Sequence, residues 1–124
     1  RRWQHGEMPG TLPVPTDHTR ICCPPLGSAE PMPKDAVIWL AIHLKALADP
    51  MRLQLLEHLL RQPAREDCTC NLAPLVKLSE PTVSHHLKKL EASGILGKER
   101  RGMSVYYRVV AEAITAIAQV LHVV

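Results

Sequence analysis

The sequence predicts a mainly α-helical domain that carries a small β-hairpin wing, the arrangement called a winged helix-turn-helix. Three observations support this fold class. Apolar residues recur at helical spacing from residue 34 to about residue 92, alternate with polar residues after Gly94, and return to a helical pattern near the C-terminus. The chain has no Phe and only 3% aromatic residues. Its core must therefore be built from Leu, Ile, Val and Ala, which suits packed helices.

The first 33 residues are predicted to be a separate N-terminal arm. A chain of 124 residues is long enough for one domain with its own core. The arm lacks hydrophobic periodicity and is rich in proline, at Pro9, Pro13, Pro15, Pro24, Pro25, Pro31 and Pro33. This composition is typical of an arm rather than of a packed core. It nevertheless carries the adjacent pair Cys22 and Cys23. We therefore divide the chain into an arm, residues 1–33, and a folded domain, residues 34–124.

Two helices open the predicted domain. The stretch "AVIWLAIHLKALAD" is apolar on nearly every face, unlike the surface helix of a monomer. Asp49 is the predicted N-cap of a second helix, and Pro50 is its first residue. The leucines of this helix recur at helical spacing, at Leu53, Leu56 and Leu60. A polar loop from Arg61 to Asp67 is expected next, followed by the "CTC" stretch and a short helix that ends near Leu78.

The stretch "LSEPTVSHHLKKLEASGIL" contains the clearest helix. Ser79 is its predicted N-cap, and Gly94 is the residue that ends it. At about 100° per residue, a core-facing stripe is formed by Val83, Leu87 and Leu90. The opposite face is polar and consists of His85, Lys88 and Lys89, with Thr82 and Ser84 on its flanks. His86 lies beside the apolar stripe and is expected to be half-buried.

After Gly94 the hydrophobic period changes to two. The segments "ILGKER" and "VYYRVV" predict two antiparallel strands that turn near Arg101 and Gly102. The final stretch, "AEAITAIAQVLHVV", predicts a helix that is too apolar to face water all round. Two such helices, over residues 36–48 and 111–123, predict a homodimer interface that is built from both.

The charge distribution favours nucleic acid as a partner. The formal net charge is +3, and the segment from Lys77 to Arg108 has seven Lys or Arg against three acids, or +4. No apolar run approaches the ~20 residues of a membrane span, and the N-terminus lacks the apolar region of a secretory signal. We therefore expect a cytoplasmic protein without membrane contact. In that compartment, stable disulfides are rare and clustered cysteines more often bind metal or carry out redox chemistry.

Several of these segments resemble a known family. The stretches "KALADPMRLQLLEHL" and "LSEPTVSHHLKKLEASGIL", together with the basic hairpin, resemble the ArsR/SmtB family of bacterial metal-responsive repressors, and the resemblance covers residues 36–124. It implies a homodimer that binds an inverted-repeat operator in double-stranded DNA and leaves it when metal binds. The stretch "CTCN" is similar to the Cys-Val-Cys-Asp thiolate motif of arsenic- and cadmium-responsive members, with Thr69 and Asn71 as substitutions.

The predicted DNA contacts come from the helix that follows Ser79 and from the wing. A recognition helix enters the major groove with its N-terminal residues toward the base edges. The residues expected to bind DNA are Ser79 at the start of the helix, Thr82, Ser84 and His85 at base edges, Lys88 and Lys89 at phosphates, and Arg100 and Arg101 at the hairpin tip. Glu80 stands where many relatives have Gln. Its carboxylate could accept from a cytosine amine or favour the helix N-terminus.

The cysteines of the "EDCTCN" stretch allow four interpretations: inert packing, half of a disulfide framework, a redox pair or metal ligands. Residues i and i+2 of a regular helix do not face the same way. Cys68 and Cys70 can therefore share one ion only if they lie in an irregular turn that enters the helix, whose N-terminus also favours thiolates. Inert packing does not account for Cys22 and Cys23, which lie on an arm with no core to fill.

Soft thiolates select soft or borderline ions. The predicted ligands form a sulfur-only set, Cys22, Cys23, Cys68 and Cys70. As(III) prefers three thiolates, whereas Cd(II), Pb(II) or Zn(II) could use three or four. The C-terminal helix lacks the Asp-x-His pattern of the family's zinc sensors and offers Glu112 and His122. The remaining histidines are expected at the surface or in packing, namely His5, His18, His43 and His58.

The prediction from the sequence is therefore a repressor that As(III) releases from DNA, with Cd(II) or Pb(II) as alternative effectors. A thiol-based redox sensor on the same scaffold is the other alternative. A thiol-disulfide enzyme is not expected, because it would need a C-x-x-C motif on a βαβ pattern and the sequence has neither.

Overall fold

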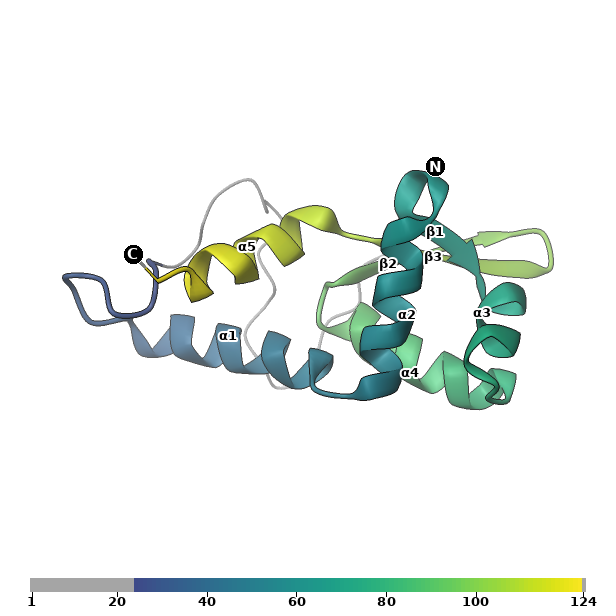
Figure 1. The fold of residues 1–124 in the computed structure, drawn as a ribbon, viewed down its shortest axis with the longest axis horizontal. Helices are drawn as coiled ribbons and strands as arrows, with labels where there is room; N and C mark the ends of the chain where they lie inside the picture. Colours follow the sequence, from purple (N-terminus) through teal and green to yellow (C-terminus); the bar gives the residue numbers. More distant parts are fainter. Residues whose placement is uncertain (1–23, 124) are drawn as a thin grey trace.

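The computed structural model describes residues 24–123 and shows an elongated molecule with two parts (Figure 1). At one end, helix α1 (Lys34–Leu47) lies beside helix α5 (Ala111–Leu121). The other end contains helices α2 (Pro50–Arg61), α3 (Thr69–Val76) and α4 (Glu80–Ala92). These helices pack with three strands, β1 (Glu66–Cys68), β2 (Leu96–Arg101) and β3 (Ser104–Val109), and a short 3₁₀ turn η1 (Pro63–Arg65) precedes β1. The predicted fold class, mainly helical with a hairpin wing, is confirmed.

The helix boundaries follow from local capping chemistry. The Asp49 carboxylate accepts hydrogen bonds from the backbone N–H groups of Met51 and Arg52 at 2.8 and 3.2 Å, which satisfies two of the unpaired donors that begin α2. Ser79 Oγ accepts from the Thr82 N–H at 3.4 Å and starts α4. Gly94, with φ of 84°, follows the end of α4 in the left-handed conformation that glycine tolerates best. All three predicted boundary residues are confirmed.

The main core lies between α2, α3, α4 and the sheet. Its fully buried side chains include the predicted stripe of α4, Val83, Leu87 and Leu90, each at 0% exposure. They meet other fully buried aliphatic residues of α2, α3 and β2, among them Leu55, Leu59, Leu72 and Leu96. Burial of one such side chain contributes about 1.5–3 kcal/mol. This core fixes α4 as a rigid platform for whatever its outer face contacts.

A second, smaller core joins α1 to α5. It consists of Ala36, Trp39, Leu40, Ala116, Ile117 and Val120. His43 is buried beside it, with Nδ1 hydrogen-bonded to the Trp39 carbonyl at 2.7 Å and its ring against the indole. Large apolar side chains remain exposed on both helices, including Val37 at 49% and Leu121 at 42%. No helix within residues 24–123 combines the length and apolar character needed to cross a membrane.

The sheet contains one strand that the sequence did not predict. Its order is β1-β3-β2, and the predicted β2–β3 hairpin turns at Gly102, where φ is 61°. Strand β1 pairs antiparallel with the other edge of β3, with Asp67 opposite Tyr107 and Cys68 opposite Tyr106. The prediction of a polar loop that extends to Asp67 is therefore wrong. Three residues carry too little pattern to indicate a strand, but the edge of β3 supplies backbone partners for them.

Candidate nucleic-acid interface and thiol site

Helix α4 presents the predicted reading residues on one outer face. The exposed side chains are Thr82, His85, Lys88 and Lys89, and Ser84 is half-buried. Ser79 Oγ lies 2.9 Å from Thr82 Oγ1 at the start of the helix. His86 is half-buried, as expected, and its Nδ1 lies 3.5 Å from Arg52 Nη1. The outer face of α4 thus offers hydroxyls, an imidazole and two ammonium groups, which are suitable donors and acceptors for base edges and phosphates.

Arg52 fixes how α4 sits against the first two helices. Its Nε donates to the carbonyl of Ala46 at the end of α1, at 2.7 Å, while its Nη1 approaches His86. The same residue donates its backbone N–H to the Asp49 cap. One arginine therefore connects α1, α2 and α4. This connection gives the Leu-Ala-Asp-Pro-x-Arg stretch a physical role in orienting α4.

The structure separates the two arginines that were predicted together at the wing tip. Arg100 is exposed. Arg101 is half-buried, donates from Nη2 to Glu66 Oε2 at 2.7 Å and from Nε to Glu99, and lies 4.3 Å above the Tyr106 ring. Hydrogen bonds to Glu99 and then Glu66 raise the pKa of Arg101. Arg101 is thus bound on the face of the sheet, because two carboxylates are within reach there.

Cys68 and Cys70 come together at the junction between β1 and α3. Cys68 is the last residue of the strand and the N-cap of the helix, and only 2% of it is exposed. Cys70 lies in the first turn of α3 and is exposed. A disulfide joins the two, with their Cα atoms 5.2 Å apart. The expected irregular turn is therefore a strand-to-helix junction, which brings two sulfur atoms together at i, i+2 spacing.

The junction from Asp67 to Asn71, called the thiol turn below, is held together by Asp67. Its Oδ1 accepts from the Cys68 N–H and from Asn71 Nδ2, both at 2.8 Å, and its Oδ2 is 2.9 Å from Nε2 of His58 on α2. Burial raises the pKa of Asp67, but the hydrogen bonds from His58, Asn71 and Cys68 outweigh it, so the pKa lies below its usual value. Neither His58 nor Asp67 was predicted to have this role. The i, i+4 spacing of Asp67 and Asn71 is a sequence signal for the hydrogen bond between these two side chains.

The other residues predicted as possible metal ligands do not join Cys68 and Cys70 in the described part of the structure. Cys22 and Cys23 lie outside the described residues, as do His5 and His18. Within residues 24–123, no three side chains among His, Cys, Asp and Glu are grouped so that they could hold a metal ion. Glu112 and His122 are both exposed on or after α5.

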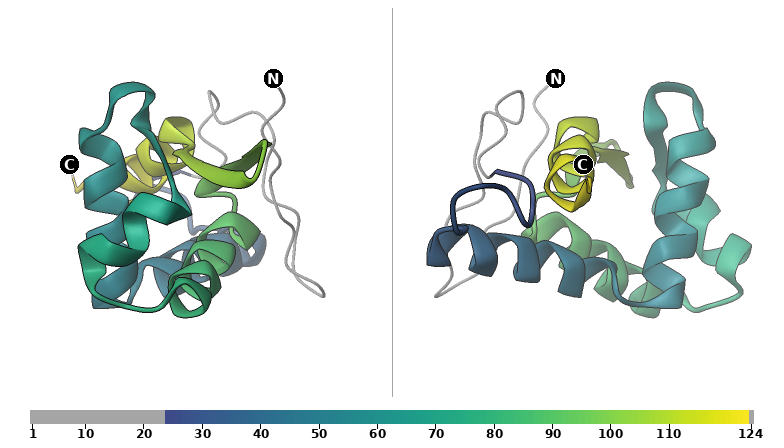
Figure 2. Two further views of the ribbon diagram at one scale, coloured as in Figure 1. Left: turned by 90° about the vertical axis from the view of Figure 1, so that its right-hand side faces the viewer. Right: turned by 60° about the vertical axis from the view of Figure 1, so that its left-hand side comes forward.

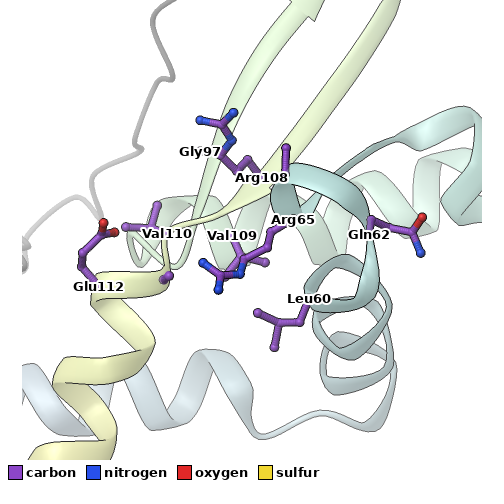
Figure 3. A pocket seen from close by; sticks show the side chains of 10 residues that line it. Leu60, Gln62, Arg65, Gly97, Arg108, Val109, Val110 and Glu112 are labelled. Carbon is purple, nitrogen blue, oxygen red and sulfur yellow. The ribbon is translucent and has the colours of Figure 1, made fainter.

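A cleft of about 670 Å³ lies where the end of α2, the base of the wing and the start of α5 meet (Figure 3). Arg65 extends into it beside Val109 and Leu60, and Glu112 stands at its margin. Ala64 and Arg65 on its rim have φ of 57° and 55°. The left-handed conformation costs roughly 1–2 kcal/mol for such residues. Within residues 24–123, none of the predicted DNA-binding or metal-ligating residues lines this cleft.

Comparison with known protein sequences gives a consistent result. The model of the bacterial regulatory protein arsR family matches residues 49–98. A transcriptional repressor SmtB homolog from Synechocystis is 42% identical over 78 residues, which are 63% of this chain and 57% of that protein. An arsenical resistance operon repressor from Staphylococcus xylosus is 33% identical over 81 residues, 65% of this chain and 75% of that protein. The chain spans little more than half the length of the Synechocystis relative.

Solved structures agree with the sequence comparison. The antimony-specific transcriptional repressor AntR superposes with a TM-score of 0.62 and is 27% identical, covering 73% of this chain and 82% of that one. A homodimeric winged helix-turn-helix DNA-binding domain from Mycobacterium bovis, a possible ArsR-family regulator, superposes with a TM-score of 0.58 and is 26% identical. It covers 73% of this chain and 84% of that one.

Proposed function

Because this chain belongs to the ArsR/SmtB family of winged helix-turn-helix transcriptional regulators, we propose that it is a dimeric repressor that As(III) releases from operator DNA. This is a family of DNA-binding regulators, not of enzymes. The observation that most supports As(III) as the effector is that the sulfur atoms of Cys68 and Cys70 lie together at the end of β1. In the reduced state the same geometry offers two soft sulfur ligands to one ion.

The names of two similar proteins support a metalloid as the effector. The Staphylococcus xylosus protein is named for arsenical resistance, and AntR for antimony. As(III) prefers three thiolates, so the proposed site needs at least one sulfur beyond Cys68 and Cys70. The arm supplies Cys22 and Cys23. Cd(II), Pb(II) and Zn(II) remain alternative effectors, because the same four thiolates could bind each of them.

The position at which the arm joins the domain favours a site shared between two protomers. The Leu26 N–H donates to the Val120 carbonyl at 2.9 Å, so the chain enters the domain beside the C-terminal end of α5. The thiol turn lies near the opposite end of the molecule's long axis (Figure 1). Cys23 and Cys22 add only two residues before Pro24, or at most about 7 Å of reach. We therefore propose that the arm of one protomer supplies thiolates to the turn of its partner.

The proposed dimer forms through α1 and α5, which share a small core and lie in the same part of the molecule (Figure 2). Exposed apolar side chains on and after these helices support this interface, namely Val37, Ile38, Leu44, Leu121 and Val123. Two α4 helices would then read successive major grooves of an inverted-repeat operator in the cytoplasm. Light scattering should show a dimer at micromolar concentration, and a monomer would remove this two-headed arrangement.

A redox-sensing repressor is the second candidate, and the disulfide between Cys68 and Cys70 favours it. Oxidation of both thiols would form this bond with loss of two electrons to an oxidant such as peroxide. The disulfide would also remove the two thiolates that As(III) needs. The two functions therefore compete for the same pair of cysteines.

One experiment separates the two candidates. An operator duplex is selected from a random DNA library with the reduced protein, and binding is followed by fluorescence anisotropy. As(III) under strict reduction should release the DNA, whereas peroxide without metal should lower the operator affinity less than As(III) does. Release by peroxide with no response to As(III) would replace the proposed function with the redox alternative.

Mixed dimers test the shared site. One chain carries Cys22→Ser with Cys23→Ser, and the other carries Cys68→Ser with Cys70→Ser. If the site is shared, each mixed dimer keeps one complete set of thiolates and binds one As(III). If the site lies within one chain, the mixed dimer has no complete set and binds none.

A further inference from the structure

The thiol turn and the DNA-binding wing belong to the same sheet. Cys68 lies opposite Tyr106 of β3, and Tyr106 lies opposite Glu99 of β2. Side chains directly across a strand pair share a face, as do alternate residues along one strand. Glu66 and Arg101 are each two residues from a member of this row, so they lie on the same face. One continuous row of side chains thus runs from the thiol turn to the wing.

Within that row, Glu66 of β1 and Arg101 of β2 are joined directly by their side chains. The Arg101 Nη2 donates to Glu66 Oε2 at 2.7 Å, although the two residues are far apart in the sequence. Their side chains are only 22% and 17% exposed, for Arg101 and Glu66. A partly buried pair of this kind is less screened by solvent than a surface pair. A second connection runs from Thr69 Oγ1 at the start of α3 to the Val105 carbonyl, at 3.3 Å.

We propose that Glu66 and Arg101 are positioning residues that transmit the state of the thiol turn to the wing. Cys68 is the last of only three residues in β1. A change in the separation or direction of the two sulfur atoms, by disulfide formation or by a shared ion, therefore displaces a strand with few backbone hydrogen bonds. Glu66 moves with that strand and carries Arg101 and the hairpin with it.

This route differs from a signal that passes only from α3 to α4. It acts on the wing, where the neighbouring Arg100 is exposed toward the solvent, and it leaves the reading face of α4 in place. As an effector-dependent device it rests on the proposed function. The mechanical connection itself needs only that the state of Cys68 and Cys70 changes.

The test measures coupling and not only DNA affinity. The wild-type protein is compared with Glu66→Gln, which keeps the shape of the side chain and removes its charge. Glu57→Gln is the matched control, because Glu57 forms an exposed pair with Arg61 within α2 and makes no part of the Glu66–Arg101 contact. For each protein, we measure As(III) binding, operator affinity with and without As(III), and amide hydrogen exchange of the wing, residues 96–109.

Glu66→Gln should bind As(III) as the wild-type protein does, but As(III) should change its operator affinity by a smaller factor. Substitutions along a coupling route typically alter that factor by about 2- to 30-fold. The exchange of the wing should respond to As(III) in the wild-type protein and in Glu57→Gln, and the response should be lost in Glu66→Gln. If As(III) binds and Glu66→Gln shows the wild-type coupling factor and wing response, the proposal is overturned.

A second arm keeps the test independent of arsenic. In a chain with Cys22→Ser and Cys23→Ser, the Cys68–Cys70 pair is compared as dithiol and as disulfide, with and without Glu66→Gln. If the wild-type protein binds no As(III), the proposed function fails, but a wing response that depends on Glu66 in this arm still supports the connection. If the exchange of the wing does not respond to the disulfide, or responds equally without Glu66, the proposal is overturned. Should Glu66→Gln fail to fold, Arg101→Lys replaces it, because lysine retains the charge but cannot pair with both carboxylates in the same geometry.

Discussion

The reading helix and the thiol turn are built in different ways, although both were recognised from short stretches of sequence. Helix α4 is capped by Ser79, one of its immediate neighbours, and its buried stripe follows directly from helical spacing. The thiol turn depends on partners that are distant in the sequence, such as Val105 and Tyr106 on β3. A helix that contacts DNA needs only to be rigid and exposed. A turn that senses an effector must also contact the elements whose position it changes.

This difference affects how substitutions should act. On α4, the side chains proposed to bind DNA and those that hold the core lie on opposite faces, so substitutions on the two faces should affect either DNA affinity or stability, but not both. In the thiol turn, Cys68 is both a proposed ligand and a buried residue that begins α3. Changes there should alter the response to the effector and the local structure together.

The largest effect is expected from Cys68→Ser combined with Cys70→Ser. Operator binding should persist, because the proposed DNA contacts of α4 begin at Thr82, but As(III) should no longer release the DNA. Serine is a good N-cap and a poor ligand for a soft ion. Anisotropy titrations with and without As(III) measure both properties. Wild-type sensitivity of this variant to As(III), Cd(II) and Pb(II) would show that the turn is structural.

Leu87→Ala should have the largest effect on stability in α4. Leu87 is fully buried in the main core, and a substitution of this kind costs about 2–5 kcal/mol. Urea unfolding followed by circular dichroism measures the loss. The adjacent Lys88→Ala is the control and should change the free energy of unfolding by no more than about 0.5 kcal/mol. Equal losses for the two variants would show that the phase of the helix is wrong.

His85→Ala should weaken operator binding by about 1–3 kcal/mol without affecting the fold, because its side chain is exposed on the outer face. Lys88→Ala should instead weaken binding to all sequences and reduce the salt dependence by about one charge. Affinity measured over a range of salt concentrations, on operator and on unrelated DNA, distinguishes the two. A loss of stability in His85→Ala would contradict the separation of the two faces.

The smallest effect concerns pH and the thiol turn. The hydrogen bonds of Asp67 hold its folded-state pKa below its usual value. The carboxylate therefore stabilises the fold above about pH 4, its unfolded pKa, and this contribution is lost as the pH falls through the folded value. Asp67→Asn should show a smaller drop in the free energy of unfolding between pH 7 and pH 3 than the wild-type protein. Equal drops would mean that Asp67 does not contribute in this way.

The sequence by itself determined the elements whose signals are local. Asp49 and Ser79 cap helices through their nearest backbone N–H groups, and Gly94 and Gly102 adopt positive φ angles that other residues resist. The outer face of α4 followed from the period of its core residues. These features need no knowledge of the rest of the chain, because the groups that interact are within a few residues of one another.

Tertiary structure alone decided the geometry of the thiol turn and the contacts of Arg101. The segment Glu66–Cys68 becomes a strand because the edge of β3 offers it hydrogen-bond partners, and this pairing places Cys68 at the start of α3. Arg101 resembled a DNA-facing residue of the tip until the same pairing brought Glu66 within 2.7 Å of it. This hydrogen bond joins residues 35 positions apart, so no local pattern in the sequence could indicate it.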